Sequence, residues 1–124
     1  MAVPIKRGSG RSDARLRLAA LLAGVSLSAV AAHAQDATWL PAPATSDWNT
    51  PANWSPATVP TGTAFFGASN TTSLTFAAAA TSIGTMQFNT GAPAYTFTLN
   101  NRSLSINGNG ITNGSPTIID LLQR

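Results

Sequence analysis

The stretch that decides the fold is YTFTLNNRSLSI, residues 95–106. Apolar and polar side chains alternate strictly over residues 95–99, and the same alternation returns at Leu104–Ile106. Because successive side chains of a β-strand point to opposite faces, this period of two predicts two strands, each with one buried face. The Asn100-Asn101 pair between them is typical of a tight turn, since Asn tolerates the left-handed backbone conformation.

Outward from this stretch, short apolar-alternating runs recur and are separated by polar or Gly/Asn links, including Asn107-Gly108-Asn109-Gly110 and Asn113-Gly114, which we predict to be turns. The predicted strands are Ala64–Phe66, Leu74–Phe76, Ile83–Phe88, Tyr95–Leu99, Leu104–Ile106 and Thr117–Ile119. Large apolar residues recur along them at the spacing of short strands. The predicted core residues are Phe76, Phe88, Phe97, Leu99 and Ile106, with Thr96 and Thr98 facing solvent.

Composition supports an all-β fold. Ser, Thr, Asn and Gly supply 40 of the 90 residues from Gln35 onward, and these favour pleated strands and turns over helices. The preferred architecture is a short-stranded β-solenoid, a parallel β-helix, in which each coil buries its inward apolar residues against the next coil. The alternative is a small antiparallel β-sandwich, because Asn-Gly links also suit hairpins. The four alanines at 77–80 fit either a bend or a brief helical turn.

Residues 1–34 form a predicted signal peptide. Basic residues extend to Arg17, Leu18–Ala32 carries no charge, and Ala32-His33-Ala34 matches the small-residue pattern of a cleavage site. We expect a helix over about residues 11–32 and cleavage after Ala34; an uncleaved membrane anchor is the alternative. The pattern predicts contact with the export machinery and a location in the periplasm, at the cell surface or outside the cell.

Residues 35–60 form a predicted Trp/Pro-rich N-terminal cap. Five prolines in this segment prevent regular strand ladders, because each lacks a backbone N–H donor. The segment also holds Trp39, Trp48 and Trp54. We expect these indoles to supply buried area. The alternative is a ligand-stacking role, in which exposed indole faces bind sugar rings.

The block WNTPANWSPATVPTGTAFFG, residues 48–67, together with the later runs at 83–97 and 104–113, resembles the start of passenger regions in bacterial autotransporter-like proteins. The resemblance covers about residues 30–117. In that family the passenger is an exported β-helix carried by an outer-membrane domain that follows it. The resemblance therefore implies a secreted or outer-membrane route and a β-helical fold. It implies no single activity, since passengers include adhesins, proteases and esterases.

The remaining segments are predicted coils at 61–119 and an atypical tail at 120–124. About three coils fit between residues 61 and 119. A solenoid normally ends in a polar capping repeat, whereas this chain has the apolar run Ile118–Leu122. We therefore expect a truncated or frameshifted end, and self-association through an exposed coil edge.

Charge and residue types restrict the function. The whole chain has a formal net charge of +3, but beyond residue 34 only Arg102 and Arg124 oppose three aspartates. This near-neutral balance argues against nucleic-acid binding, which needs several cations on phosphates. Beyond residue 34 there is no His, Lys, Glu or Cys, so a Ser or Thr nucleophile lacks a base. We therefore predict no enzyme activity, and no catalytic, metal or cofactor site.

Two classes of function follow from these expectations. The first is a non-catalytic stretch of an exported passenger with a structural or adhesive role, binding a host surface or a polysaccharide. The second is a free secreted carbohydrate-binding module that uses the Trp-rich segment, and it requires at least one indole held exposed beside polar donors.

Overall fold

A computed structural model describes residues 33–124 of the chain. The helix expected over about residues 11–32 and the Ala32 half of the cleavage pattern lie outside the described residues. Ala34, the other half, lies in exposed, non-strand backbone ahead of the first strand.

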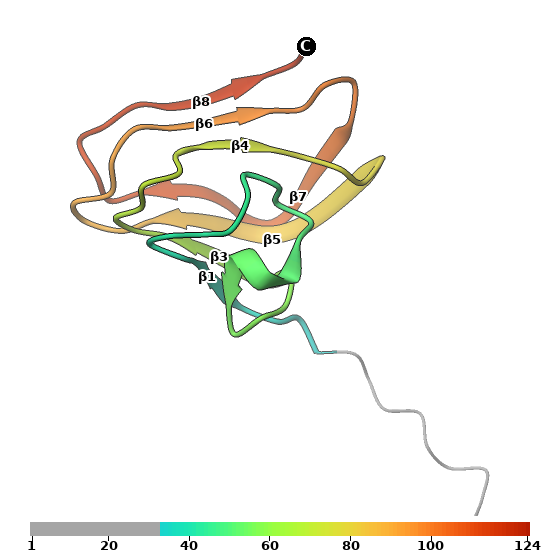
Figure 1. Cartoon of the computed structure of the whole chain (residues 1–124), viewed down its shortest axis with the longest axis horizontal. Coiled ribbons are helices and arrows are strands. Elements are labelled where there is room, and N and C mark those ends of the chain that lie inside the picture. Colours follow the sequence, from blue (N-terminus) through green and yellow to red (C-terminus); the bar gives the residue numbers. More distant parts are fainter. Residues whose placement is uncertain (1–32) are drawn as a thin grey trace, which may run out of the picture. The chain divides into compact units, whose positions relative to one another are not determined.

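Short strands account for nearly all regular structure of the described chain (Figure 1). One turn of 3₁₀ helix, η1 (Pro51–Asn53), interrupts them. The strands are β1 (Ala37–Trp39), β2 (Trp54–Ser55), β3 (Thr63–Phe66), β4 (Ser73–Thr75), β5 (Ala80–Phe88), β6 (Tyr95–Thr98), β7 (Ser103–Asn113) and β8 (Ile119–Leu122).

The strands form two parallel sheets that face each other, as a β-solenoid of about four turns. The larger sheet has the order β2-β1-β3-β5-β7 and the smaller has β4-β6-β8, so the chain alternates between the two layers (Figure 1). Every strand pair is parallel except β1 with β2. The solenoid prediction is confirmed, and the antiparallel sandwich is wrong because successive turns stack in the same direction.

The repeat of the solenoid becomes visible in the register. Phe66 pairs with Phe88, 22 residues later, and Leu74 pairs with Phe97, 23 residues later. The spacings of 12 and 9 residues between apolar positions in the sequence are steps within and between the two layers of a turn. One turn therefore brings chemically similar side chains into a stack, which buries each against its neighbour.

The segment 35–60 is more than a cap. Its strand β1 pairs in parallel with β3, and Asp47 forms a parallel bridge to Thr75 at the edge of the smaller sheet. The segment thus contributes the first turn of the solenoid, which is why the turns number about four where about three were expected. Its second half returns as η1 and β2, and β2 covers the outer edge of β1.

Two boundaries near the end of the sequence were wrong. The tail at 120–124 is largely β8, which pairs with β6 along its whole length. The Asn107–Gly110 run is not a separating turn but lies inside β7, as a bulge between the pairs Ile83–Ile106 and Thr85–Gly110. Gly110 there has φ +85°, a conformation that glycine adopts without strain. The Asn100-Asn101 turn is confirmed, with φ of 51° and 62°.

The core lies between the two sheets and is dominated by aromatic rings. Phe76, Phe88 and Phe97 are buried as predicted, whereas Leu99 and Ile106 are only partly buried and pack against the side of the core. Thr96 and Thr98 alternate with the buried residues of β6 and lie partly exposed on its outer face. The four alanines at 77–80 form a bend that leads into β5.

A column of glycines runs through three consecutive turns of the larger sheet. A Cβ on Gly84 would lie 2.7 Å from the Gly62 carbonyl oxygen, and a Cβ on Gly108 would lie 2.5 Å from that of Gly84. At the first turn the Asp36 carboxylate takes the corresponding place against Gly62 and accepts a hydrogen bond from the Thr63 N–H at 2.7 Å. The backbones of successive turns therefore approach closely at this point, which only glycine allows.

Candidate functional site

The three tryptophans lie together in the core of the first turn. Trp39, Trp48 and Trp54 are 1%, 0% and 2% exposed. Trp54 packs edge-on against both others, with ring centroids 5.1 Å from Trp39 and 5.0 Å from Trp48. The interpretation of these residues as buried area is confirmed. None presents an exposed indole face, so the condition for their ligand-stacking role is not met.

Hydrogen bonds of the indoles connect segments of the first two turns. The Trp39 Nε1–H donates to the Thr71 carbonyl at 2.9 Å, and the Trp54 Nε1–H donates to the Trp48 carbonyl at 2.8 Å. The Trp48 Nε1–H is buried without an acceptor among the described residues. Its ring instead stacks on Phe76, with centroids 5.4 Å apart. Packing therefore holds Trp48, and hydrogen bonds fix the other two indoles.

A polar network closes the loop that joins β1 to β2. Asn53 is completely buried, and its side-chain amide donates to Thr45 Oγ1 and to the Asp47 carbonyl, at 2.7 and 2.8 Å. Asp47 Oδ1 accepts from the Asn49 N–H at 3.1 Å, which is an Asx turn, and from the Ala77 N–H at 2.9 Å. Both buried polar side chains are satisfied within the fold, so this network is explained by structure alone.

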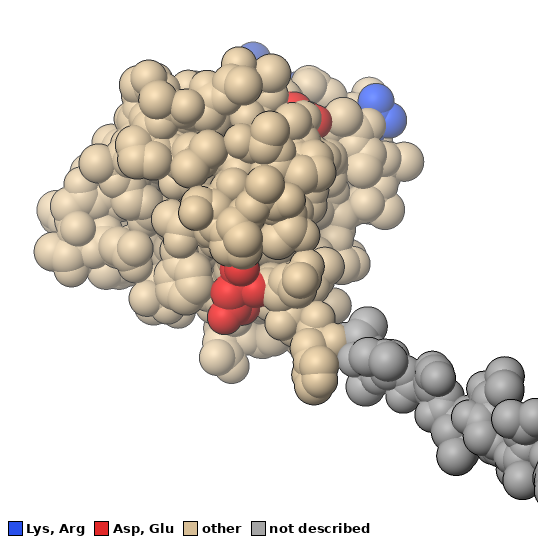
Figure 2. Space-filling model, turned by 60° about the horizontal axis from the view of Figure 1, so that its bottom comes forward, with Lys and Arg blue, Asp and Glu red and all other residues tan. Residues whose placement is uncertain are grey.

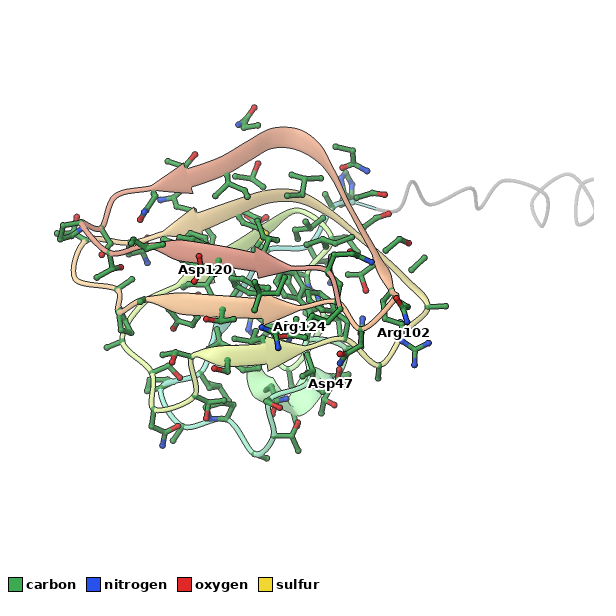
Figure 3. All side chains as sticks on the ribbon, turned by 90° about the horizontal axis from the view of Figure 1, so that it is seen from above. Asp47, Arg102, Asp120 and Arg124 are labelled. Atoms are coloured by element: carbon green, nitrogen blue, oxygen red, sulfur yellow. The ribbon has the colours of Figure 1, made fainter. Side chains whose placement is uncertain are left out.

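The charged groups of the described residues are few and lie apart. The face of the molecule in Figure 2 is almost entirely uncharged. Asp47 lies beside β4, Asp120 on β8 and Arg102 at the bend before β7 (Figure 3). Residues 33–124 contain no cluster of three His, Cys, Asp or Glu side chains that could hold a metal ion, and no pocket is found. The sequence contained no signal for a catalytic site, and the described residues bring no candidate groups together.

A row of uncharged side chains crosses the whole outer face of the larger sheet. In β3 the buried residues Ala64 and Phe66 flank Phe65, so the Phe65 ring points outward and is partly exposed. Register places hydroxyl and amide side chains beside it on every other strand. The row is Ser55 (β2), Thr38 (β1), Phe65 (β3), Gln87 (β5) and Thr112 (β7).

Sequence reasoning missed this row. Its members are scattered between residues 38 and 112, and only the pairing of five strands aligns them. The one available signal was the Phe65-Phe66 pair, because adjacent residues of a strand point to opposite faces and one of two neighbouring rings must face out. Neighbouring strands lie about 4.8 Å apart, so the row is a flat strip about 19 Å long.

The outer face of the smaller sheet has a different character. Its rows are Ser73, Thr96 and Asp120, and Thr75, Thr98 and Leu122. These rows contain hydroxyl groups, one carboxylate and one aliphatic side chain, and no aromatic ring. The larger sheet is therefore the face with the chemistry to stack on a flat, apolar ring surface.

No protein-family model, curated protein or solved structure matches the chain. In the part of the chain that the structure describes, no helix is long and apolar enough to cross a membrane.

Proposed function

We propose that this chain is a non-catalytic part of an exported surface protein, at the start of an autotransporter-like passenger, with a structural or adhesive role. Support comes from the resemblance of residues 48–67 to passenger starts, from the leader pattern of residues 1–34 and from the β-solenoid itself, the architecture that the resemblance implies. The proposal includes contact with the export machinery and a final location at or beyond the cell envelope.

The observation that carries the adhesive role is the row around Phe65. A flat strip of hydroxyl and amide groups without charge offers hydrogen bonds to a neutral surface, and the central ring offers a stacking face. The absence of charge favours a neutral ligand over an acidic or basic one, because a charged ligand gains no ion pair on this face. Neutral polysaccharide is therefore the preferred target.

Affinity electrophoresis of the full chain in gels containing neutral polysaccharides tests this role. We expect retardation by at least one neutral polysaccharide and loss of that retardation in Phe65→Ala. Thr98→Ala is the matched control, because Thr98 points outward from the smaller sheet and its replacement leaves the row unchanged. Unretarded migration of the wild-type chain in every gel contradicts the adhesive role, as does equal retardation of Phe65→Ala.

The second candidate, a free secreted carbohydrate-binding module, differs in how the chain is carried and not in the surface used. The burial of Trp39, Trp48 and Trp54 moves its site from those indoles to Phe65. The two candidates separate by fractionation of the producing cells. A passenger stays with the outer-membrane fraction, whereas a free module is recovered from the medium.

Export is tested separately by the N-terminus of the secreted protein. Mass spectrometry is expected to find Gln35 as the first residue, and Ala34 replaced by a bulky residue should block processing. Recovery of an intact Met1 from the exported fraction contradicts this prediction.

A further inference from the structure

The last turn of the solenoid leaves two strand edges without a neighbour in the described residues. β7 has eleven residues and pairs only with β5, and β8 pairs only with β6 (Figure 1). At the opposite end β2 covers the edge of β1, and the Trp48 N–H donates to the Thr75 carbonyl at the edge of β4. One end of the stack is therefore closed and the other is open.

Apolar side chains are exposed at the open end because of their position in the stack. Ile111 is the register partner of Met86, and Leu121 is the register partner of Phe97. Met86 and Phe97 are 0% exposed, whereas Ile111 and Leu121 are 41% and 43% exposed. The side chains point to the same interior, so the difference comes from the lack of a covering turn.

The devices that usually protect an edge strand are weak here. Charged residues and prolines prevent edge-to-edge pairing, and β7 contains neither. Its one protective feature is the bulge at 107–109, which divides the edge into two straight halves of four residues, 103–106 and 110–113. β8 carries a single charge, Asp120, in register with the outward-facing Thr96.

We infer that the open ends of two copies of this chain pair with each other, with β7 antiparallel to β7 and β8 antiparallel to β8 of the second copy. A two-fold axis normal to both sheets forms the two pairings at once. The same axis exchanges the two halves of β7, so that residues 103–106 of one copy lie opposite residues 110–113 of the other. The exposed Ile111 and Leu121 side chains are then covered from the second copy.

A second copy arranged head to tail does not fit this surface. Such an arrangement requires the β1 edge of one copy for the β7 edge of the next, and β2 already occupies that edge. The complement of the long β7 edge is therefore another β7 edge, and the assembly closes at two copies. This inference does not depend on the proposed adhesive function.

Sedimentation velocity of the full chain over a range of concentrations tests the inference. We expect a monomer–dimer equilibrium without larger species. Ile111→Lys and Leu121→Lys place a charge in the contact, and each should weaken dimerisation by about tenfold or more. Thr112→Lys and Thr98→Lys are matched controls, since they add the same charge at adjacent or equivalent strand positions that face outward, and they should leave the dimer in place.

Hydrogen exchange of the unmodified chain gives a second readout in case a lysine variant fails to fold. The amides of β7 that point away from β5 should become protected as the concentration rises. A monomer at every concentration overturns the inference, and so does growth into open polymers. A dimer that both lysine variants retain in folded form also overturns it, because the contact then lies elsewhere.

Discussion

The first turn of the solenoid and its last turn differ in how their outer edges are finished. In the first turn β2 pairs back onto β1, and Asn53 and Asp47 satisfy the polar groups of the connecting loop. In the last turn β7 and β8 simply follow the register of the turn before them. Both turns contribute apolar residues to the same interior, yet only the first is fully buried.

This difference teaches that burial in a solenoid depends on the next turn more than on the residue itself. Leu121 and Ile111 occupy positions that bury Phe97 and Met86 one turn earlier. The free energy of burial scales with the apolar area removed from water, so equivalent positions contribute very differently at the two ends. Local stability should therefore fall from the closed end toward the open end.

The largest expected effect compares two register partners directly. Phe97→Ala removes a fully buried ring that contacts Trp48, Phe66, Phe88 and Tyr95, and it should cost about 3–5 kcal/mol of unfolding free energy. Leu121→Ala, at the same position in the last turn, should cost less than about 1 kcal/mol in the monomer. Urea unfolding curves measured at a dilute concentration give both values. Equal losses would break the comparison.

A large part of the fold could be predicted from the sequence, since alternation within a few residues is a local property. The strict pattern at residues 95–99 located β6, and the aromatic residues Phe88 and Phe97 were correctly assigned to the core. The partial burial of Leu99 and Ile106 was missed, because alternation identifies the inward face of a strand and does not say whether another turn covers it.

Other features could not be predicted because they depend on pairing between distant residues. The repeat is hidden by unequal turn lengths, 22 residues from Thr63 to Thr85 and 25 from Thr85 to Gly110. The first turn was mistaken for a cap, because its prolines conceal the three-residue strand β1. The row around Phe65 exists only once five strands are aligned.

The glycine column offers the next test and concerns the middle of the stack. Gly84→Ala puts a Cβ 2.7 Å from the backbone carbonyl of Gly62, which cannot move without disturbing the first turns, and should cost about 1–3 kcal/mol. Gly67→Ala is the control, because no atom lies within 4 Å of its added Cβ. Thermal unfolding of the two variants should differ clearly. A Gly84→Ala protein as stable as the control would refute the close approach of the turns.

Asp36 sharpens the comparison at the closed end, where its carboxylate ends the glycine column. Removal of the acceptor in Asp36→Ala leaves the Thr63 N–H without its 2.7 Å hydrogen bond and should cost about 1 kcal/mol. Asp36→Asn keeps an acceptor oxygen and should lose less. Chemical denaturation measures both. An alanine variant with wild-type stability would show that the first turn needs no such cap.

Tyr95 gives a smaller effect that depends on pH. Its hydroxyl donates to the Gly67 carbonyl at 2.6 Å, and burial raises the pKa of this side chain from 10.0 to about 12, with a Ser69 hydrogen bond acting in the opposite direction. The folded chain thus keeps the phenol proton at a pH where the unfolded chain loses it. The corresponding stability is complete below pH 10 and is lost as the pH rises toward about 12.

Tyr95 is the only tyrosine of the chain, so the phenolate absorbance follows this one group. A titration midpoint clearly above that of the urea-unfolded chain is expected. A midpoint equal to that of the unfolded chain would contradict the burial of Tyr95 between β5 and β6. In Tyr95→Phe the loss of stability between pH 10 and 12 should disappear.

Residue-level hydrogen exchange at a concentration where the chain is monomeric tests the central claim most directly, namely a parallel solenoid closed at one end and open at the other. β5 lies between β3 and β7, so all its amides outside the bulge should be slow. In β7 the Ser103 N–H donates to the Ala79 carbonyl, and alternate amides face the free edge. We predict alternating slow and fast exchange along residues 103–106. Uniform protection of those residues together with alternating protection in β5 would contradict the stacking order and the open end.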